Sequence, residues 1–172
     1  MFDKEYSFRG SHAAKVKKLT EAFDGKNSIF KTNYDVYVVA PIIGFSYKKK
    51  VPRDRDTASK TDIFIEKLIK ERDNLMFSYR LIMLADVDYE PDLQKRIDKA
   101  FKYYNTAQAK EDEELYDSYV RGGVDLLYEY IVGKSHTSED YIENIYNFMH
   151  DFQRRLEDID LEKIMDLCKN QT

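Results

Sequence analysis

Turn-forming residues are scarce in this 172-residue chain, and their scarcity limits the folds that it can adopt. The chain has 6 glycines and 3 prolines, with no glycine between Gly44 and Gly122 and no proline after Pro91. Sandwiches and barrels need a turn about every 8–12 residues, and those turns depend on glycine, proline and asparagine. Long stretches rich in Glu, Lys, Leu, Ile and Met favour helices instead. The sequence therefore predicts an all-α fold.

The spacing of apolar residues predicts a single domain, residues 1–172, folded as an irregular bundle of six or seven helices. The strongest helical pattern covers about 60–86, where apolar residues recur with a period near 3.6. Ser59 and Asp62 at its start have the spacing of a capping box. Because residues 75–85 are apolar on nearly every side, we expect a long, buried central helix here.

Two other segments are harder to interpret. In residues 33–47, a run of valines favours a strand, whereas a cap at Thr32 or Asn33 favours a helix kinked by Pro41. A strand here has no obvious pairing partner, so we interpret the segment as a helix. Residues 1–10 read as an N-terminal arm, after which Ser11 is expected to cap the first helix.

Composition excludes several classes of protein. Lys and Arg total 28 against 32 Asp and Glu, so the net charge of −4 does not suit general binding to a polyanion. The one cysteine, Cys168, excludes internal disulfides and multi-thiolate zinc sites. We expect it to pack as a small apolar residue on a last helix that begins near Asp160.

Without a signal peptide or an apolar run of about 18 residues, the sequence predicts a cytoplasmic protein with no membrane contact. The lysine-rich composition is typical of a bacterial or phage protein.

Catalytic and metal-binding patterns are weak. Nucleophile elbows, phosphate-binding loops and dinucleotide fingerprints do not occur. His150-Asp151 forms a dipeptide found in helical metal-dependent phosphohydrolases, for which His136 and Asp166 are the available additional ligands. The spacing fits such a site poorly, so we interpret the pair as a solvated helix surface. The sequence thus predicts no catalytic residue, no metal, no cofactor and no enzyme activity.

A basic loop, residues 48–59, gives the first candidate binding site. Five cations occur within eight residues, next to an aromatic ring that can stack on a base. The structural alternative is a solvated loop between helices whose aspartates partly cancel its charge. The residues that would contact phosphate or nucleic acid are Tyr47, Lys48, Lys49, Lys50, Arg53 and Arg55.

Two arginines give the second candidate site. Arg80 lies in the most apolar run of the chain and needs an anionic partner if it is buried. Arg121 precedes Gly122 and Gly123 within a helical pattern. We favour close helix packing at these glycines, with Arg121 paired to a carboxylate of its own helix, Asp117 or Asp125. The alternative is a helix break that exposes an anion site to both arginines.

Tyrosines on several predicted helices point to a protein interface, since they cannot all face one small core. The leading hypothesis is a non-catalytic α-helical interaction protein, a small accessory subunit of a bacterial or phage assembly, which binds a protein partner or itself. A nucleic-acid-associated module that uses the basic loop is the first alternative. The second alternative is an enzyme that acts on a phosphorylated substrate through Arg80 and Arg121. The structural alternative for any one of these tyrosines is a partly buried ring with a solvated hydroxyl. The tyrosines in question are Tyr103, Tyr104, Tyr116, Tyr119, Tyr128, Tyr130, Tyr141 and Tyr146.

Overall fold

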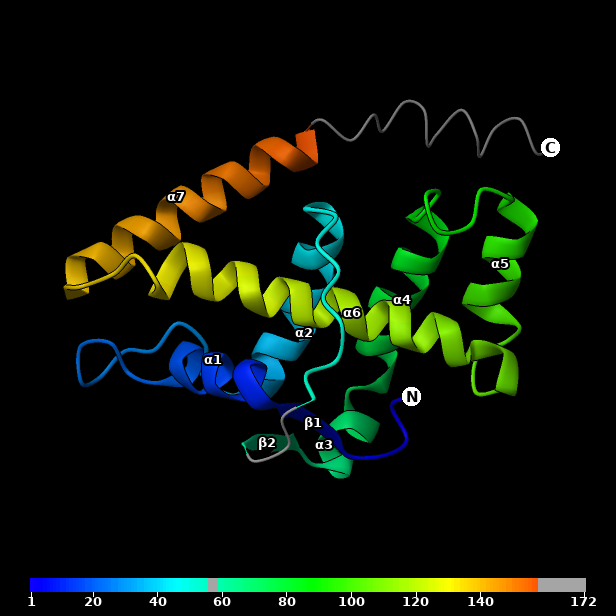
Figure 1. The fold of residues 1–172 in the computed structure, drawn as a ribbon, viewed down its shortest axis with the longest axis horizontal. Helices are drawn as coiled ribbons and strands as arrows, with labels where there is room; N and C mark the ends of the chain where they lie inside the picture. Colours follow the sequence, from blue (N-terminus) through cyan, green and yellow to red (C-terminus); the bar gives the residue numbers. More distant parts are fainter. Residues whose placement is uncertain (56–58, 158–172) are drawn as a thin grey trace.

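The computed structural model describes residues 1–55 and 59–157. These residues form seven α-helices and a two-stranded antiparallel sheet, which confirms the predicted all-α bundle (Figure 1). In chain order the elements are β1 (Tyr6–Arg9), α1 (Gly10–Thr20), α2 (Asn33–Ser46), β2 (Lys60–Ile63), α3 (Ile65–Lys70), α4 (Arg72–Ala85), α5 (Leu93–Phe101), the 3-10 turn η1 (Ala107–Ala109), α6 (Lys110–Leu127), the π-helical turn η2 (Tyr128–Val132) and α7 (Ser138–Glu157).

Helix α6 lies at the centre of the molecule and crosses α2 at close range (Figure 1). The approach depends on glycine in both helices. A Cβ atom on Gly123 would lie 1.8 Å from the Ala40 carbonyl oxygen, and one on Gly44 would lie 2.1 Å from the Tyr119 carbonyl oxygen. The two backbones therefore touch where a side chain would keep them apart.

The prediction of a central helix over 60–86 is wrong in extent and in position. Lys60–Ile63 form strand β2, so Ser59 and Asp62 cap no helix, and the rest of the segment divides into α3 and α4. One face of α4 is buried, but Phe77 and Leu81 on its other face are exposed. The apolar residues that indicated burial on all sides thus include several that face solvent.

Residues 33–47 form helix α2, as we interpreted them, up to Ser46. The Thr32 hydroxyl accepts a hydrogen bond from the Asp35 backbone N–H at 3.3 Å, and the Asp35 carboxylate accepts one from the Thr32 backbone N–H at 2.9 Å. This reciprocal capping box satisfies two N–H groups at the helix start. Pro41 lies inside the helix and is buried.

Residues 1–10 are not a peripheral arm. Strand β1 pairs antiparallel with β2, with Tyr6 opposite Ile63. Phe2 is fully buried, and its ring packs edge-on against those of Tyr37 and Tyr116 at centroid distances of 6.4 Å and 6.0 Å. The N-terminal segment therefore supplies part of the core.

Tyrosines fill much of this core, so fewer of them are available for an outer surface than the interface hypothesis requires. Tyr116 and Tyr119 are buried, and the Tyr119 hydroxyl donates a hydrogen bond to the buried Asp86 carboxylate at 2.6 Å. Of the eight tyrosines considered for an interface, Tyr130 and Tyr146 are exposed. Four are half-buried, as in the structural alternative: Tyr103, Tyr104, Tyr128 and Tyr141. The rings of the buried tyrosines add apolar area to the core, while polar neighbours satisfy some of the hydroxyl groups.

Helix α1 begins at Gly10, so Ser11 lies in its first turn and is not its cap. The capping group comes from the loop after α2. An Asp54 carboxylate oxygen accepts hydrogen bonds from the backbone N–H and the hydroxyl of Ser11, both at 2.8 Å. Gly10 has a φ of +55°, and a Cβ atom there would lie 2.3 Å from the same oxygen.

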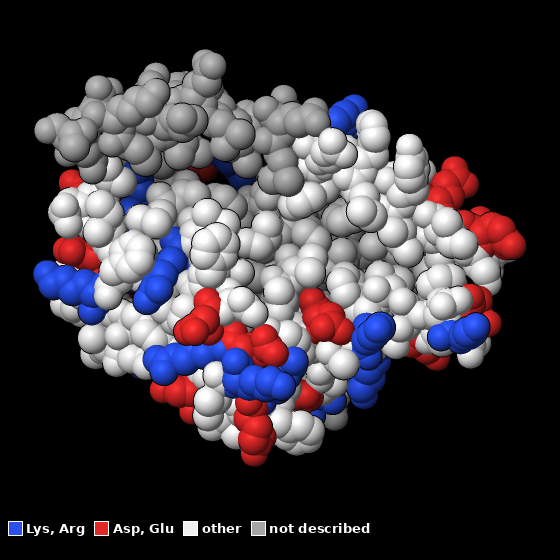
Figure 2. All heavy atoms as spheres, turned by 180° about the vertical axis from the view of Figure 1, so that it is seen from behind, with Lys and Arg blue, Asp and Glu red and all other residues white. Residues whose placement is uncertain are grey.

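Charged side chains of both signs are interspersed on the rear face of the molecule, around a broad area without charge (Figure 2). Among the described helices, none has the length and apolar character needed to cross a membrane. The predicted last helix from Asp160, with Cys168 on its apolar side, lies outside the described residues, as do Asp166 and residues 56–58 of the basic loop.

Candidate functional site

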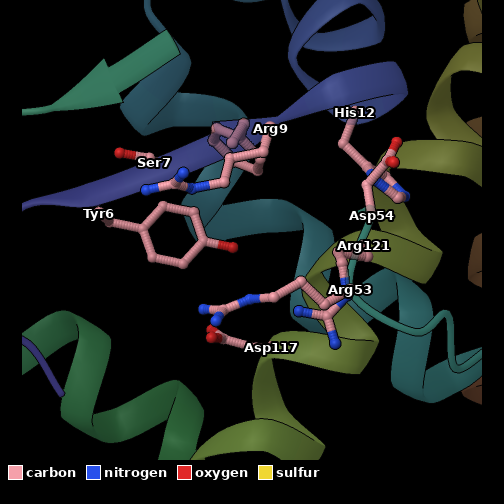
Figure 3. Close-up of a pocket in the computed structure, with 9 residues that line it drawn as sticks. Tyr6, Ser7, Arg9, His12, Arg53, Asp54, Asp117 and Arg121 are labelled. Carbon is pink, nitrogen blue, oxygen red and sulfur yellow. The ribbon is translucent and has the colours of Figure 1, made fainter. Parts of the chain in front are cut away.

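A small polar cavity lies where β1, α1, the loop after α2 and α6 meet (Figure 3). It brings together Arg53 from the predicted phosphate-binding loop and Arg121 from the predicted anion site, which the sequence analysis treated as separate candidates. Figure 3 shows the side chains of Tyr6, Arg53 and Asp117 turned toward the same space. The lining residues are Tyr6, Ser7, Phe8, Arg9, His12, Arg53, Asp54, Asp117 and Arg121.

Arg121 is buried, and its guanidinium group is already engaged. Nε donates a hydrogen bond to the Val51 carbonyl oxygen at 2.7 Å, and the terminal nitrogen forms an ion pair with Glu114. The expected partners were Asp117 or Asp125, one turn away. Glu114 is seven residues back, close to two full turns, and therefore lies on the same face of α6. These contacts hold the loop after α2 against α6.

Helix α6 continues without a break through Gly122 and Gly123. A Cβ atom on Gly122 would lie 1.8 Å from the Lys49 carbonyl oxygen, just as one on Gly123 would meet Ala40. Both glycines therefore allow backbone contact, which is the structural interpretation that we favoured. The alternative of an exposed helix start at Val124 is wrong, because the backbone there lies within α6.

Asp117 contributes a carboxyl group to the cavity. Burial raises the pKa of Asp117 to about 7, although the nearby guanidinium groups of Arg121 and Arg53 lower it. Its Oδ1 atom has no hydrogen-bond partner among the described residues. Burial also raises the pKa of the Tyr6 hydroxyl, so this group stays protonated. The pKa of Asp117 is thus well above that of a free carboxyl group, although two positive charges lie nearby.

His12 closes the cavity on the side of α1 and is only 4% exposed. Its Nε2 atom lies 3.3 Å from an Asp125 carboxylate oxygen, which also accepts a hydrogen bond from Lys15 at 2.7 Å. Burial alone would raise the pKa of Asp125, but these two neighbours hold it below its usual value. The Nδ1 atom of His12 has no partner among the described residues.

The cavity has a volume of about 30 Å³. That is room for one or two water molecules, which suits polar atoms that lack a protein partner. A phosphorylated substrate does not fit in this space. The chemistry that the arrangement supports is a hydrated polar junction between α1, β1 and α6, with Arg9 and Arg53 exposed around it.

Arg80 lies in a different part of the molecule. Its guanidinium group stacks over the Phe101 ring of α5, 5.0 Å from the ring centroid. Both residues line a shallow cavity of about 340 Å³ with Phe77 and Leu81. Arg80 and Arg121 therefore do not converge, and the geometry expected of a two-arginine phosphate site does not form.

Three lysines of the basic loop each face a carboxylate. Binding to phosphate would require the ammonium groups of these lysines, which the ion pairs already engage. The distances from Nζ to oxygen are 2.7 Å for Lys48 and Asp88, 2.9 Å for Lys49 and Glu129, and 3.7 Å for Lys50 and Asp86.

Tyr47 is held by α7 and is not free to stack on a base. Its hydroxyl donates a hydrogen bond to the Asp151 carboxylate at 2.6 Å, and the Arg155 guanidinium lies 4.0 Å from its ring centroid. The hydrogen bonds from Tyr47 and Arg155 lower the pKa of Asp151 to about 2. Asp151 thus joins α7 to the end of α2. No cluster of metal-ligating side chains surrounds it or occurs elsewhere within 1–55 and 59–157. Arg55 is exposed.

An open apolar groove, which the sequence analysis missed, lies between α2, α4 and α7. Its volume is about 520 Å³, and Ser78 is the one polar residue among the described residues that line it. The sequence feature that could have indicated this groove is the apolar composition of α2, which has more apolar residues than one buried helix face needs. The lining residues are Ile29, Phe30, Val38, Val39, Ile42, Ile43, Ser78, Leu127, Ile131, Ile145, Phe148, Met149 and Phe152.

The described residues thus define a helical protein with a small polar junction and an open apolar groove. The family model for DNA sulphur modification system-associated protein 4 matches residues 10–164. The match covers most of the chain, which therefore belongs to this family. No curated protein and no solved structure matches the chain.

Proposed function

We propose that this chain is a non-catalytic accessory subunit that works with the bacterial DNA sulphur modification system in the cytoplasm and binds another component through its apolar groove. The groove between α2, α4 and α7 is the observation that carries the proposal. The family's association with that system supports the choice of partner.

The groove has the form that accepts the apolar face of a helix from another protein. Val39 and Met149, on its two sides, remain exposed although apolar side chains surround them. Removing apolar surface from water contributes about 25 cal/mol per Å², so covering this surface favours association. Amphipathic helices bind such grooves through residues spaced by three and four positions.

The polar junction supports a non-catalytic role. Arg121 is held by Glu114 and Val51, and the cavity beside it has a volume of only about 30 Å³. Nucleic-acid contact through residues 48–55 has less support than the groove, because Lys48, Lys49 and Lys50 face carboxylates. The charges on the rear face are also mixed in sign (Figure 2).

The test is co-expression of the tagged chain with the other proteins of a DNA sulphur modification system, followed by affinity purification. We expect one of those proteins to copurify. Val39→Asp places a charge in the groove without opening the core, since Val39 is exposed, and should abolish the copurification.

Val87→Asp is the matched control, because Val87 is also exposed but lies outside the groove. It should leave the complex intact. Circular dichroism should show that both variants are folded. Equal copurification of the Val39→Asp variant and the unchanged chain would contradict the proposal.

A further inference from the structure

Helix α7 carries apolar residues on two faces, of which only one packs against the molecule. On the inner face, Phe148 is buried and Ile145 lies against the core. On the outer face, Ile142, Tyr146 and Met149 are 63%, 68% and 65% exposed. Figure 1 shows α7 along the outside of the bundle.

The outer residues form a continuous stripe. Their spacings of four and three residues place them on one side of the helix over two turns. Tyrosine and methionine are enriched in protein interfaces. Single exposed apolar residues are ordinary on a protein surface, whereas an ordered stripe of them is not. This stripe, Ile142–Tyr146–Met149, is separate from the function proposed for the groove, although Met149 borders both.

Charge changes sign along α7. Its first turns carry Glu139, Asp140 and Glu143. Its last turns carry Arg154 and Arg155, which form exposed ion pairs with Asp151 of the same helix at 3.0 Å and 3.1 Å. Side by side in a parallel pair, two copies of α7 would place acid against acid and base against base. In an antiparallel pair, each acidic half faces the two arginines of the other copy.

We propose that the outer face of α7 binds the same face of a second copy of this chain, with the two helices antiparallel. The two copies are then related by a two-fold axis near Tyr146, so that the same patch of each copy contacts the other. Ile142 of one copy then lies near Met149 of the other. Glu139 lies near Arg154 of the second copy, and Glu143 lies near its His150.

Sedimentation or light scattering over a range of protein concentrations tests this proposal. The purified chain should show twice the monomer mass of 20.4 kDa. Ile142→Glu should raise the dissociation constant of the dimer by about tenfold or more, because it buries an unpaired carboxylate in the contact. Ile69→Glu is the matched control on α3, where Ile69 is also exposed, and it should leave the dimer intact.

A charge exchange tests the antiparallel arrangement. Glu139→Arg or Arg154→Glu alone should weaken the dimer through like charges, whereas the double variant should restore it, because opposite charges again face each other between copies. In a parallel pair the double variant would keep like charges together. A monomer at every concentration, or no effect of Ile142→Glu, would overturn the proposal. The Val39→Asp variant should still dimerise, which separates this result from the groove experiment.

Discussion

At the residue scale, the missing side chain of Gly123 sets the distance between α2 and α6. We predict that Gly123→Ala destabilises the protein by about 1–3 kcal/mol, the usual cost of forcing extra volume into a packed core. The added methyl group would lie 1.8 Å from the Ala40 carbonyl oxygen, so the helices must separate. Chemical denaturation of the variant and the unchanged chain measures the difference.

Gly133→Ala is the control for this substitution. A Cβ atom on Gly133 would find its nearest neighbour at 3.5 Å, and the backbone has helical dihedral angles. The change should be neutral or stabilise the protein by up to about 1 kcal/mol, through the lower entropy of the unfolded chain. If both variants lose equal stability, the close crossing of α2 and α6 does not explain the loss in the Gly123→Ala variant.

At the scale of elements, local signals predicted the helices well and contacts between distant segments poorly. Helix α2 was predicted because a strand there had no obvious pairing partner, and Thr32, one of the two caps considered, forms its capping box. Strand β2 was missed because its partner, β1, is more than fifty residues away, and four residues show no clear period. Phe77 and Leu81 of α4 were assigned to the core although they are exposed, since periodicity does not show which apolar face another element covers.

For the candidate sites too, the sequence indicated individual residues but not the contacts between distant segments. Arg53 and Arg121 were both named from the sequence, but their meeting in one cavity depends on how the loop after α2 lies across α6. Asp117 appeared only as a possible partner of Arg121, and its raised pKa depends on burial that the sequence does not show. The groove combines residues from Ile29 to Phe152, so no short motif could indicate it.

Helix α1 depends on a cap supplied by a different element, and this gives a prediction. Asp54→Ala should destabilise the protein by about 0.5–2 kcal/mol, because the Ser11 N–H loses its acceptor at the helix start. Asp54→Asn keeps an acceptor oxygen and should cost less. Thermal denaturation followed by circular dichroism measures both variants. Equal losses would show that the carboxylate charge matters more than the capping hydrogen bond.

At the scale of the whole molecule, the folded unit extends beyond the region that defines the family. The family match begins at residue 10, yet Phe2 and Phe8 are buried and β1 forms half of the sheet. Strand β1 also lines the polar cavity beside α6. The first nine residues therefore connect the core, the sheet and the polar junction.

Phe2→Ala tests the contribution of this segment to the fold. We predict a loss of roughly 3–5 kcal/mol in the free energy of unfolding, as for other buried phenylalanines, because the substitution leaves a cavity between Tyr37 and Tyr116. Phe64→Ala is the matched control, since Phe64 is 67% exposed, and it should change stability by less than about 0.5 kcal/mol. Urea denaturation of both variants provides the comparison. Similar stabilities would mean that residues 1–9 lie on the bundle without supporting it, whereas the expected difference would extend the cooperative unit to the second residue of the chain.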